Sequence, residues 1–108
     1  MPYMETILVF SNLPDQASAA KLAAVLIEQR LAACVNVQAP CTSVYRWQGK
    51  VETATEVPVF IKTTLERYPA LEAAIRAHHP HELPEIIAVP VVAGLPAYLE
   101  WVRTETII

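Results

Sequence analysis

Residues 35–61 read VNVQAPCTSVYRWQGKVETATEVPVFI. Apolar and polar residues alternate on both sides of Gln48-Gly49, which is the pattern of a β-hairpin. Each strand is predicted to be about fourteen residues long and to reach ~46 Å, although a typical strand has only about 5–6 residues. A globular domain of this length has a radius of gyration of ~13 Å, so the hairpin is expected to overhang its own domain and to need a partner surface.

Two prolines predict a break in this hairpin. If the turn is centred on Gln48-Gly49, Pro40 lies opposite Val57, and Pro58 lies opposite Ala39. Proline cannot donate a hydrogen bond to a strand ladder, so we expect a bulge or bend at this height. The bend would divide a half that belongs to the domain from a half that overhangs it.

Strands and helices alternate in the rest of the chain. An apolar run predicts a central strand at 5–12, and Asp15 is a natural N-cap for a helix over 16–30. Further segments are predicted as a helix over 67–78, a strand over 85–92, a short helix from Gly94 onward and a last edge strand in 104–108. The order β-α-β-β-α-β, followed by a helix, is the ferredoxin-like split arrangement. Residues 1–108 are therefore expected to form a single α+β domain with two helices on one face of an antiparallel sheet.

The composition predicts an oligomer. Apolar residues make up 54% of the chain and charged residues 18%, whereas soluble domains usually have ~45–50% and ~25%. The longest apolar run, 86–93, is interrupted by Pro90 and is far shorter than the ~20 residues of a membrane span, so no membrane partner is expected. Lys and Arg are scattered in a chain of net charge −3, which argues against nucleic-acid binding. A homo-oligomer interface is left to cover the apolar excess.

The N-terminus and the cysteines point to a cytoplasmic protein. Residues 1–6 contain no basic residue, and the apolar run that follows is too short for a signal peptide. Cys34 and Cys41 lie in one predicted strand at a separation of ~23 Å, whereas the Cα atoms of a disulfide lie within about 7 Å. They are therefore not expected to pair, and we interpret them as small buried side chains.

Several classes of enzyme are disfavoured by the residues present. Two glycines are too few for a P-loop or a dinucleotide fingerprint, and a single aspartate, Asp15, argues against a Ser-His-Asp triad. The two cysteines lie in predicted strands, without a neighbour that would activate a thiol. The chain is therefore expected to bind a ligand or metal ion and not to be an enzyme.

Three histidines within four residues, His78, His79 and His81, are candidate metal ligands. Imidazole suits copper, zinc and nickel, and Glu82 or Glu85 would add a carboxylate. At a helix end His78 and His79 point in different directions, so one of them is expected to face the core. His79 and His81, in an extended His-Pro-His segment, would point to the same side. The alternative is a solvated loop with one packed histidine.

Trp47, at the predicted hairpin tip, has two interpretations. The first is packing in a subunit interface. The second is a wall of a ligand pocket between subunits, closed by Tyr45 and the cationic Lys62.

Five motifs together resemble a known family. They are AACVN (32–36), SVYRWQGK (43–50), IKTT (61–64), HPHELPE (79–85) and YLEW (98–101). In this order they resemble the CutA family, the divalent-cation tolerance proteins, over essentially the whole chain. The resemblance implies a ferredoxin-like homotrimer, similar in architecture to the PII signalling proteins, in which long hairpins clasp neighbouring subunits. It also implies an association with tolerance of copper and other divalent cations.

The resemblance also implies a copper site, with two departures in this chain. Bacterial members have a site assigned to a cysteine at the end of the first strand and two adjacent histidines, which match His78 and His79. Ser11 stands at the position of that cysteine, and His81 stands where the family usually has tyrosine. A Cu(II) site of imidazoles and carboxylate is therefore expected in place of a Cu(I) thiolate site.

Three functions remain open from the sequence. The leading hypothesis is a trimeric divalent-metal, and specifically copper, binding protein linked to divalent-cation tolerance. The second is a PII-like trimeric regulator that takes a small anionic or nucleotide-like ligand between subunits, near Trp47, Lys62 and Glu82. The third is a structural trimer that engages another protein, with incidental metal contacts.

Overall fold

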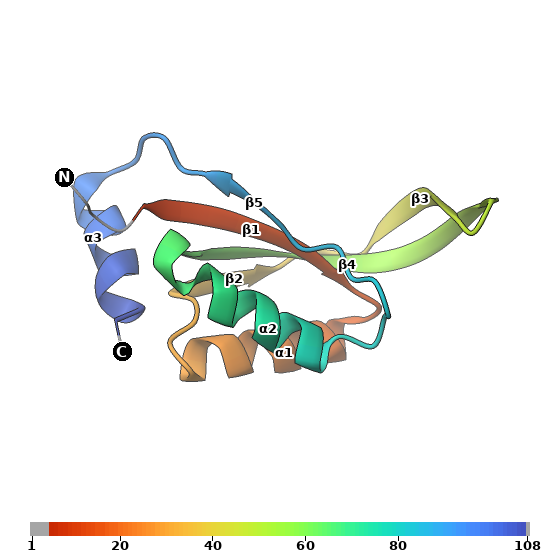
Figure 1. The fold of residues 1–108 in the computed structure, drawn as a ribbon, viewed down its shortest axis with the longest axis horizontal. Helices are drawn as coiled ribbons and strands as arrows, with labels where there is room; N and C mark the ends of the chain where they lie inside the picture. The colour runs from red at the N-terminus through yellow and green to blue at the C-terminus, as the bar shows by residue number, and fades with distance from the viewer. Residues whose placement is uncertain (1–4, 108) are drawn as a thin grey trace.

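The computed structural model describes residues 5–107. The elements follow in the order β1 (Thr6–Leu13), α1 (Gln16–Glu28), β2 (Cys34–Val37), β3 (Cys41–Trp47), β4 (Lys50–Thr64), the 3-10 turn η1 (Leu65–Arg67), α2 (Tyr68–His78), β5 (Ile87–Pro90) and α3 (Pro96–Glu105). In Figure 1, α1 and α2 cover one face of the sheet, and the hairpin of β3 and β4 extends away from them. The predicted α+β, ferredoxin-like fold with a protruding hairpin and a C-terminal helix is confirmed.

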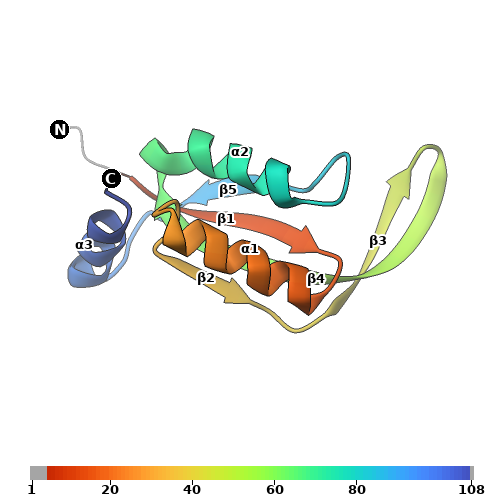
Figure 2. The same ribbon diagram turned by 90° about the horizontal axis from the view of Figure 1, so that it is seen from below.

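The sheet has the strand order β2-β4-β1-β5, and β3 pairs with the far part of β4. All pairings are antiparallel, with β1 between β4 and β5. Figure 2 shows the two helices lying across this sheet, with the hairpin beyond them and α3 at the opposite end of the molecule. Within residues 5–107, the sheet and helices therefore form one packed body, and the hairpin departs from it.

The core lies between the sheet and the helices α1 and α2. Alternate residues of β1 and β4 face it, and the apolar stripes of the helices close it. Its largest members are Val9, Leu13, Leu22, Leu26, Val57, Val59, Ile61, Leu71 and Ile75, each no more than 2% exposed. Ser11 occupies one of the core-facing positions of β1, also buried, and its hydroxyl has no hydrogen-bond partner among the described residues.

The helix ends follow the predicted signals. The carboxylate of Asp15 accepts a hydrogen bond of 2.7 Å from the backbone N–H of Ser18, which caps α1. This bond lowers the pKa of the Asp15 carboxyl below its ordinary value, because it stabilises the charged form. Pro69 lies in the first turn of α2, where its missing N–H is tolerated.

The proline-rich segment of the hairpin contains the predicted bulge. In the outer half, Trp47 pairs with Lys50, as expected for a turn at Gln48-Gly49, but in the inner half Cys34 pairs with Lys62. The register therefore slips by one residue across 38–40, which belong to neither strand. Because of this slip, the prediction of one continuous first strand is wrong. The first arm of the hairpin is divided into β2 and β3, whereas the second arm, β4, runs unbroken for 15 residues.

The hairpin tip is a tight turn with two left-handed residues. The φ angles are 50° at Gln48 and 82° at Gly49, which are the signs that a two-residue type I′ turn requires. The principal extents of the chain, 47 × 25 × 23 Å, show how far the hairpin lengthens it. Val44 and Val51, on the outer face of the hairpin, are 66% and 65% exposed.

Three further predictions need correction or lie partly outside the described residues. The edge strand predicted in 104–108 is wrong over 104–107, because α3 continues to Glu105 and the hydroxyl of Thr106 donates to the carbonyl of Val102. Cys34 and Cys41 are both free, but neither is buried as predicted, because Cys34 is half-buried and Cys41 is exposed. Residues 1–4 and 108, on which the export and edge-strand predictions partly rest, lie outside the described residues. No helix in the described range is long and apolar enough to cross a membrane.

Replacing Gly49 by alanine should loosen the outer hairpin. An L side chain in the left-handed region costs roughly 1–2 kcal/mol, and no heavy atom lies within 4 Å of the added Cβ, so backbone strain alone supplies the cost. Hydrogen exchange of the amides of β3 should accelerate by roughly tenfold, while that of β1 stays unchanged. Gly49→Asn, which tolerates positive φ better, should have a smaller effect. Equal exchange in Gly49→Ala and the wild type would contradict the turn geometry.

Candidate functional site

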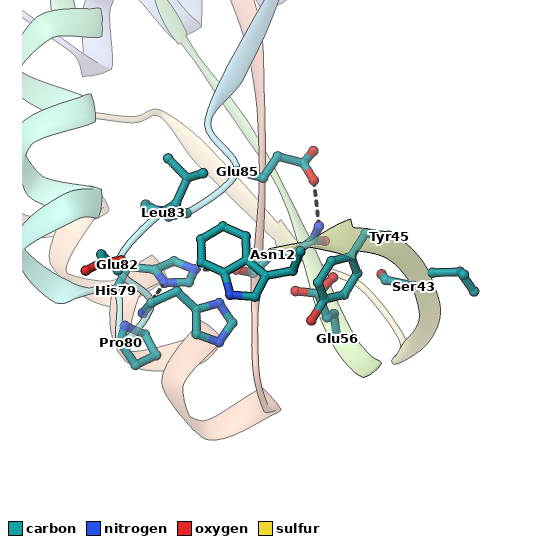
Figure 3. Close-up of a pocket in the computed structure, with 13 residues that line it drawn as sticks. Asn12, Ser43, Tyr45, Glu56, His79, Pro80, Glu82, Leu83 and Glu85 are labelled. Atoms are coloured by element: carbon teal, nitrogen blue, oxygen red, sulfur yellow. Dashed lines mark hydrogen bonds between the residues drawn. The ribbon is translucent and has the colours of Figure 1, made fainter. Parts of the chain in front are cut away.

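A cavity of about 860 Å³ lies where the hairpin leaves the domain. It is lined by Asn12 of β1, by Ser43, Val44, Tyr45 and Trp47 of β3, by Glu56 of β4, and by the whole loop 79–85. In Figure 3 the labelled side chains of the hairpin lie on one side and those of the loop on the other, with Asn12 and Glu85 between them. The cavity therefore joins the two motifs, SVYRWQGK and HPHELPE, that are separated in the sequence.

The loop 79–85 is held at both ends. Its first residue, His79, has an extended conformation (φ −90°, ψ 134°), as expected before Pro80, and this ends α2 at His78. At its other end, the carboxylate of Glu85 accepts a hydrogen bond of 2.8 Å from the side-chain amide of Asn12. Both ends are thereby attached to the end of the central strand β1, because His79 also contacts Asn12.

His79 uses both ring nitrogens inside the protein. Its Nδ1 accepts a hydrogen bond of 3.0 Å from the backbone N–H of His81, so the proton of the neutral ring lies on Nε2. Nε2 donates across 2.5 Å to the backbone carbonyl of Asn12. The residue is only 8% exposed. No lone pair of His79 is left for a metal ion in this arrangement.

The other two histidines keep ring nitrogens available. Nδ1 of His78 lies 2.9 Å from the carbonyl of Ala74, which can only accept, so Nδ1 carries the proton and Nε2 is the nitrogen with a lone pair. The ring of His81 lies beside that of His79, with centroids 4.9 Å apart and planes tilted by 53°. His78 and His81 are both exposed. The histidine that faces inward is therefore His79.

These groups do not form a ready metal site within one chain. In the range 5–107, no three His, Cys, Asp or Glu side chains lie close enough together to hold a metal ion. Ser11 faces the core from β1 and does not line the cavity. The predicted set His78, His79 and His81 thus fits a single-chain metal site poorly, and His79 is its unsuitable member.

The predicted ligand pocket is assembled only in part. Tyr45, Trp47 and Glu82 line the cavity together. Lys62 does not, because it lies on the inner half of β4 opposite Cys34, where its ammonium group donates to the side chain of Asn36. A pocket that contains Lys62 together with the other three is therefore not formed within one chain.

Glu56 and Asn12 are among the lining residues that were missed in the sequence, and alternation along the strands could have identified Glu56. Glu56 pairs with Cys41, on the same face of the hairpin as Tyr45 and Trp47. Asn12 carries no comparable signal, because its role depends on the loop that folds back on it.

The lining of the cavity is anionic. Three carboxylates contribute to it, from Glu56, Glu82 and Glu85, and no Lys or Arg of the described residues does. A concave site lined by charges of one sign concentrates the field and attracts ions of opposite charge. The cavity is therefore suited to cations and unsuited to the small anion that Lys62 would have bound.

His79→Ala should destabilise the protein, because it leaves the carbonyl of Asn12 and the N–H of His81 unsatisfied. We expect a loss of about 2 kcal/mol in the free energy of unfolding. His78→Ala, at an exposed position, should cost less than about 0.5 kcal/mol. His79→Gln, whose amide nitrogen can replace Nε2 as a donor, should recover part of the loss. Urea denaturation of the three variants is the measurement, and equal stability of His78→Ala and His79→Ala would contradict the assigned role.

Comparison with known proteins places this fold and cavity in a family. Residues 7–105 match the family described as CutA1 divalent ion tolerance protein. The chain is 42% identical over 98 residues to the divalent-cation tolerance protein CutA of Thermus thermophilus, covering 91% of this chain and 95% of that protein. The crystal structure of CutA from Xylella fastidiosa is similar with a TM-score of 0.92 at 46% identity, covering 94% of this chain and 98% of that one. The CutA of Archaeoglobus fulgidus, described as periplasmic, has a TM-score of 0.91 at 33% identity, covering 94% and 98%. The chain belongs to the CutA family of divalent-cation tolerance proteins.

Proposed function

We propose that this chain acts in divalent-cation tolerance by binding the cation itself, with Cu(II) as the ion to test first, and that it does so as a cytoplasmic homotrimer. The observation that supports the proposal is the cavity, which is lined by three carboxylates and an exposed imidazole and by no Lys or Arg of the described residues. The proposed role is binding and not catalysis, since the residue content argues against the common catalytic motifs.

The ligands that the cavity offers are His81, Glu82 and Glu56. Imidazole and carboxylate together suit Cu(II), and no thiolate is needed. Glu85 uses one carboxylate oxygen to hold Asn12, so it positions the loop and leaves a second oxygen toward the cavity. Because no complete set is assembled in one chain, binding requires movement of the loop or a ligand from a neighbouring subunit, such as an exposed His78. The affinity is therefore expected to be modest.

The proposed homotrimer rests on exposed apolar surface. Large apolar side chains are exposed on the hairpin (Val44, Val51), on the edge strand β5 (Ile87, Val89) and on α3 (Tyr98, Trp101). Exposed apolar patches on a protein surface mark interaction sites. Here three separate elements carry large exposed apolar side chains. In an oligomer each hairpin has a neighbour to lie against, which the extended shape of one chain does not offer.

The hypothesis of a PII-like regulator for an anionic ligand is less well supported. Lys62, its cationic group, is hydrogen-bonded to Asn36 and does not line the cavity. Such a ligand would need Lys62 of one subunit to meet Trp47 of another. The third hypothesis is a structural trimer that engages a protein partner, and it is supported by the same exposed apolar side chains. It differs from the proposed cation binding because it assigns no role to the carboxylates of the cavity.

Oligomeric state is tested by light scattering. The wild type should have three times the chain mass of 12.0 kDa at micromolar concentration. The double substitution Val44→Asp and Val51→Asp should shift it towards monomers, because charges on the outer hairpin face disfavour burial there. Ala24→Glu, on the exposed side of α1, is the matched control and should stay trimeric. A folded wild-type monomer would refute the trimer.

Cation binding is tested by calorimetric titration of Cu(II) into metal-free protein. His81→Ala and Glu82→Gln should each weaken binding by roughly tenfold, because each removes a proposed ligand. Binding should also weaken as the pH is lowered from about 8 to about 5.5, since protons compete for imidazole and carboxylate. The double variant Cys34→Ser and Cys41→Ser is the control and should bind as the wild type does. Loss of Cu(II) binding in the cysteine variant alone would refute this site. Equal binding by all variants would show that copper binds nonspecifically at the protein surface.

A further inference from the structure

The cavity has an aromatic wall that a bare metal ion would not need. Tyr45 and Trp47 are two residues apart on β3, so both side chains project from the same face of the hairpin towards the loop. Tyr45 is 44% exposed and Trp47 is 38% exposed, so neither residue is covered by the rest of the chain. On the loop side the lining is apolar as well, from Leu83 and Pro84.

We infer that this cavity binds a small organic ammonium ion with an apolar body. The carboxylates favour a ligand of positive charge, because Glu56 and Glu82 line the cavity and have no ion-pair partner among the described residues. Arg46 and Lys50, at the hairpin tip, do not line the cavity. An ammonium group gains charge-assisted hydrogen bonds from carboxylates and an electrostatic attraction to the face of a tryptophan.

The volume of the cavity indicates the size of the ligand. Its volume of about 860 Å³ lies in the range of about 300–1,000 Å³ that is usual for sites of small organic molecules. The apolar body would lie between the rings of the hairpin and the side chain of Leu83, which is itself 71% exposed in this chain and would gain cover. The ammonium group would lie towards Glu56 and Glu82. The hydrogen bond from Asn12 to Glu85 holds the loop in place for both contacts.

This inference does not depend on the proposed metal binding, but the two proposals share two residues, Glu56 and Glu82. Both carboxylates are assigned to both ligands, so the ammonium ion and Cu(II) should compete. By thermodynamic linkage each ligand then weakens the binding of the other by the same factor. An amine that binds metal-free protein with its full affinity would separate the two functions experimentally.

The test uses three probes of similar shape and different charge: phenethylamine, phenethyl alcohol and phenylacetate. The protein carries Trp101→Phe, outside the cavity on α3, so that Trp47 is the only tryptophan and its fluorescence reports on the cavity. The protein is treated with a chelator and measured as the intact oligomer. Phenethylamine should give a saturable change, the neutral alcohol should bind at least roughly fivefold more weakly, and the anion should not bind.

Variants then test which groups recognise the charge. Glu56→Gln and Glu82→Gln keep the shape of the lining, and each should weaken the binding of phenethylamine by roughly fivefold. Glu28→Gln, on an exposed carboxylate at the end of α1, removes the same charge elsewhere and should have no effect. Trp47→Leu keeps an apolar side chain, and its ligand binding is measured by calorimetry. It should weaken the binding of the amine more than that of the alcohol.

Several outcomes would overturn the inference. Equal affinity for the amine and the alcohol would show an apolar pocket without selection for charge. If Glu28→Gln and Glu82→Gln weakened the binding of phenethylamine equally, the effect would come from the net charge of the protein and not from the cavity. N-acetyl-lysinamide that bound more tightly than phenethylamine would assign the cavity to a lysine side chain of a partner protein in place of a free amine.

Discussion

Strand β4 pairs with the core strand β1 along its inner part and with the hairpin strand β3 along its outer part. Its inner part pairs with both β1 and β2 and buries Val57, Val59 and Ile61, while its outer part pairs with β3 alone. Because the strand is unbroken, the position of the hairpin is set by the packing of the core. Glu56 lies at the boundary, directly before the buried Val57, and this is where the cavity forms. Core and site are thus linked by one continuous backbone.

The second constraint is the attachment of the loop 79–85 to Asn12. His79 donates to the carbonyl of Asn12, and the amide of Asn12 donates to Glu85, so one residue of β1 holds both ends of the loop. Three neighbouring imidazoles consequently have three different roles. His78 extends a helix end, His79 is a structural hydrogen-bonding group, and His81 is available to a ligand. Their proximity in the sequence does not make them equivalent.

Much of the fold could be predicted because strands and helices impose a regular period on side chains. Alternation identified the hairpin and its turn, and the inability of proline to donate predicted the bulge at 38–40. The site was predicted less completely. The loop 79–85 has no period, so the sequence alone could not decide which histidine would be buried or that Asn12 would hold the loop. Lys62 was grouped with Trp47, but the register places it on the inner half of β4.

The residue Ser11 changes the meaning of the family resemblance. Alternation along β1 directs Ser11 into the core with Val9 and Leu13, whereas Asn12 faces Glu85. A cysteine at position 11 would therefore place its thiol beneath the helices, on the other side of the strand from the Asn12 side chain. The absence of a thiolate from the cavity then depends on the direction of the strand and not only on the identity of residue 11. Cation binding by this chain is accordingly expected to depend on carboxylates and imidazole, and the aromatic wall to add selection for organic cations.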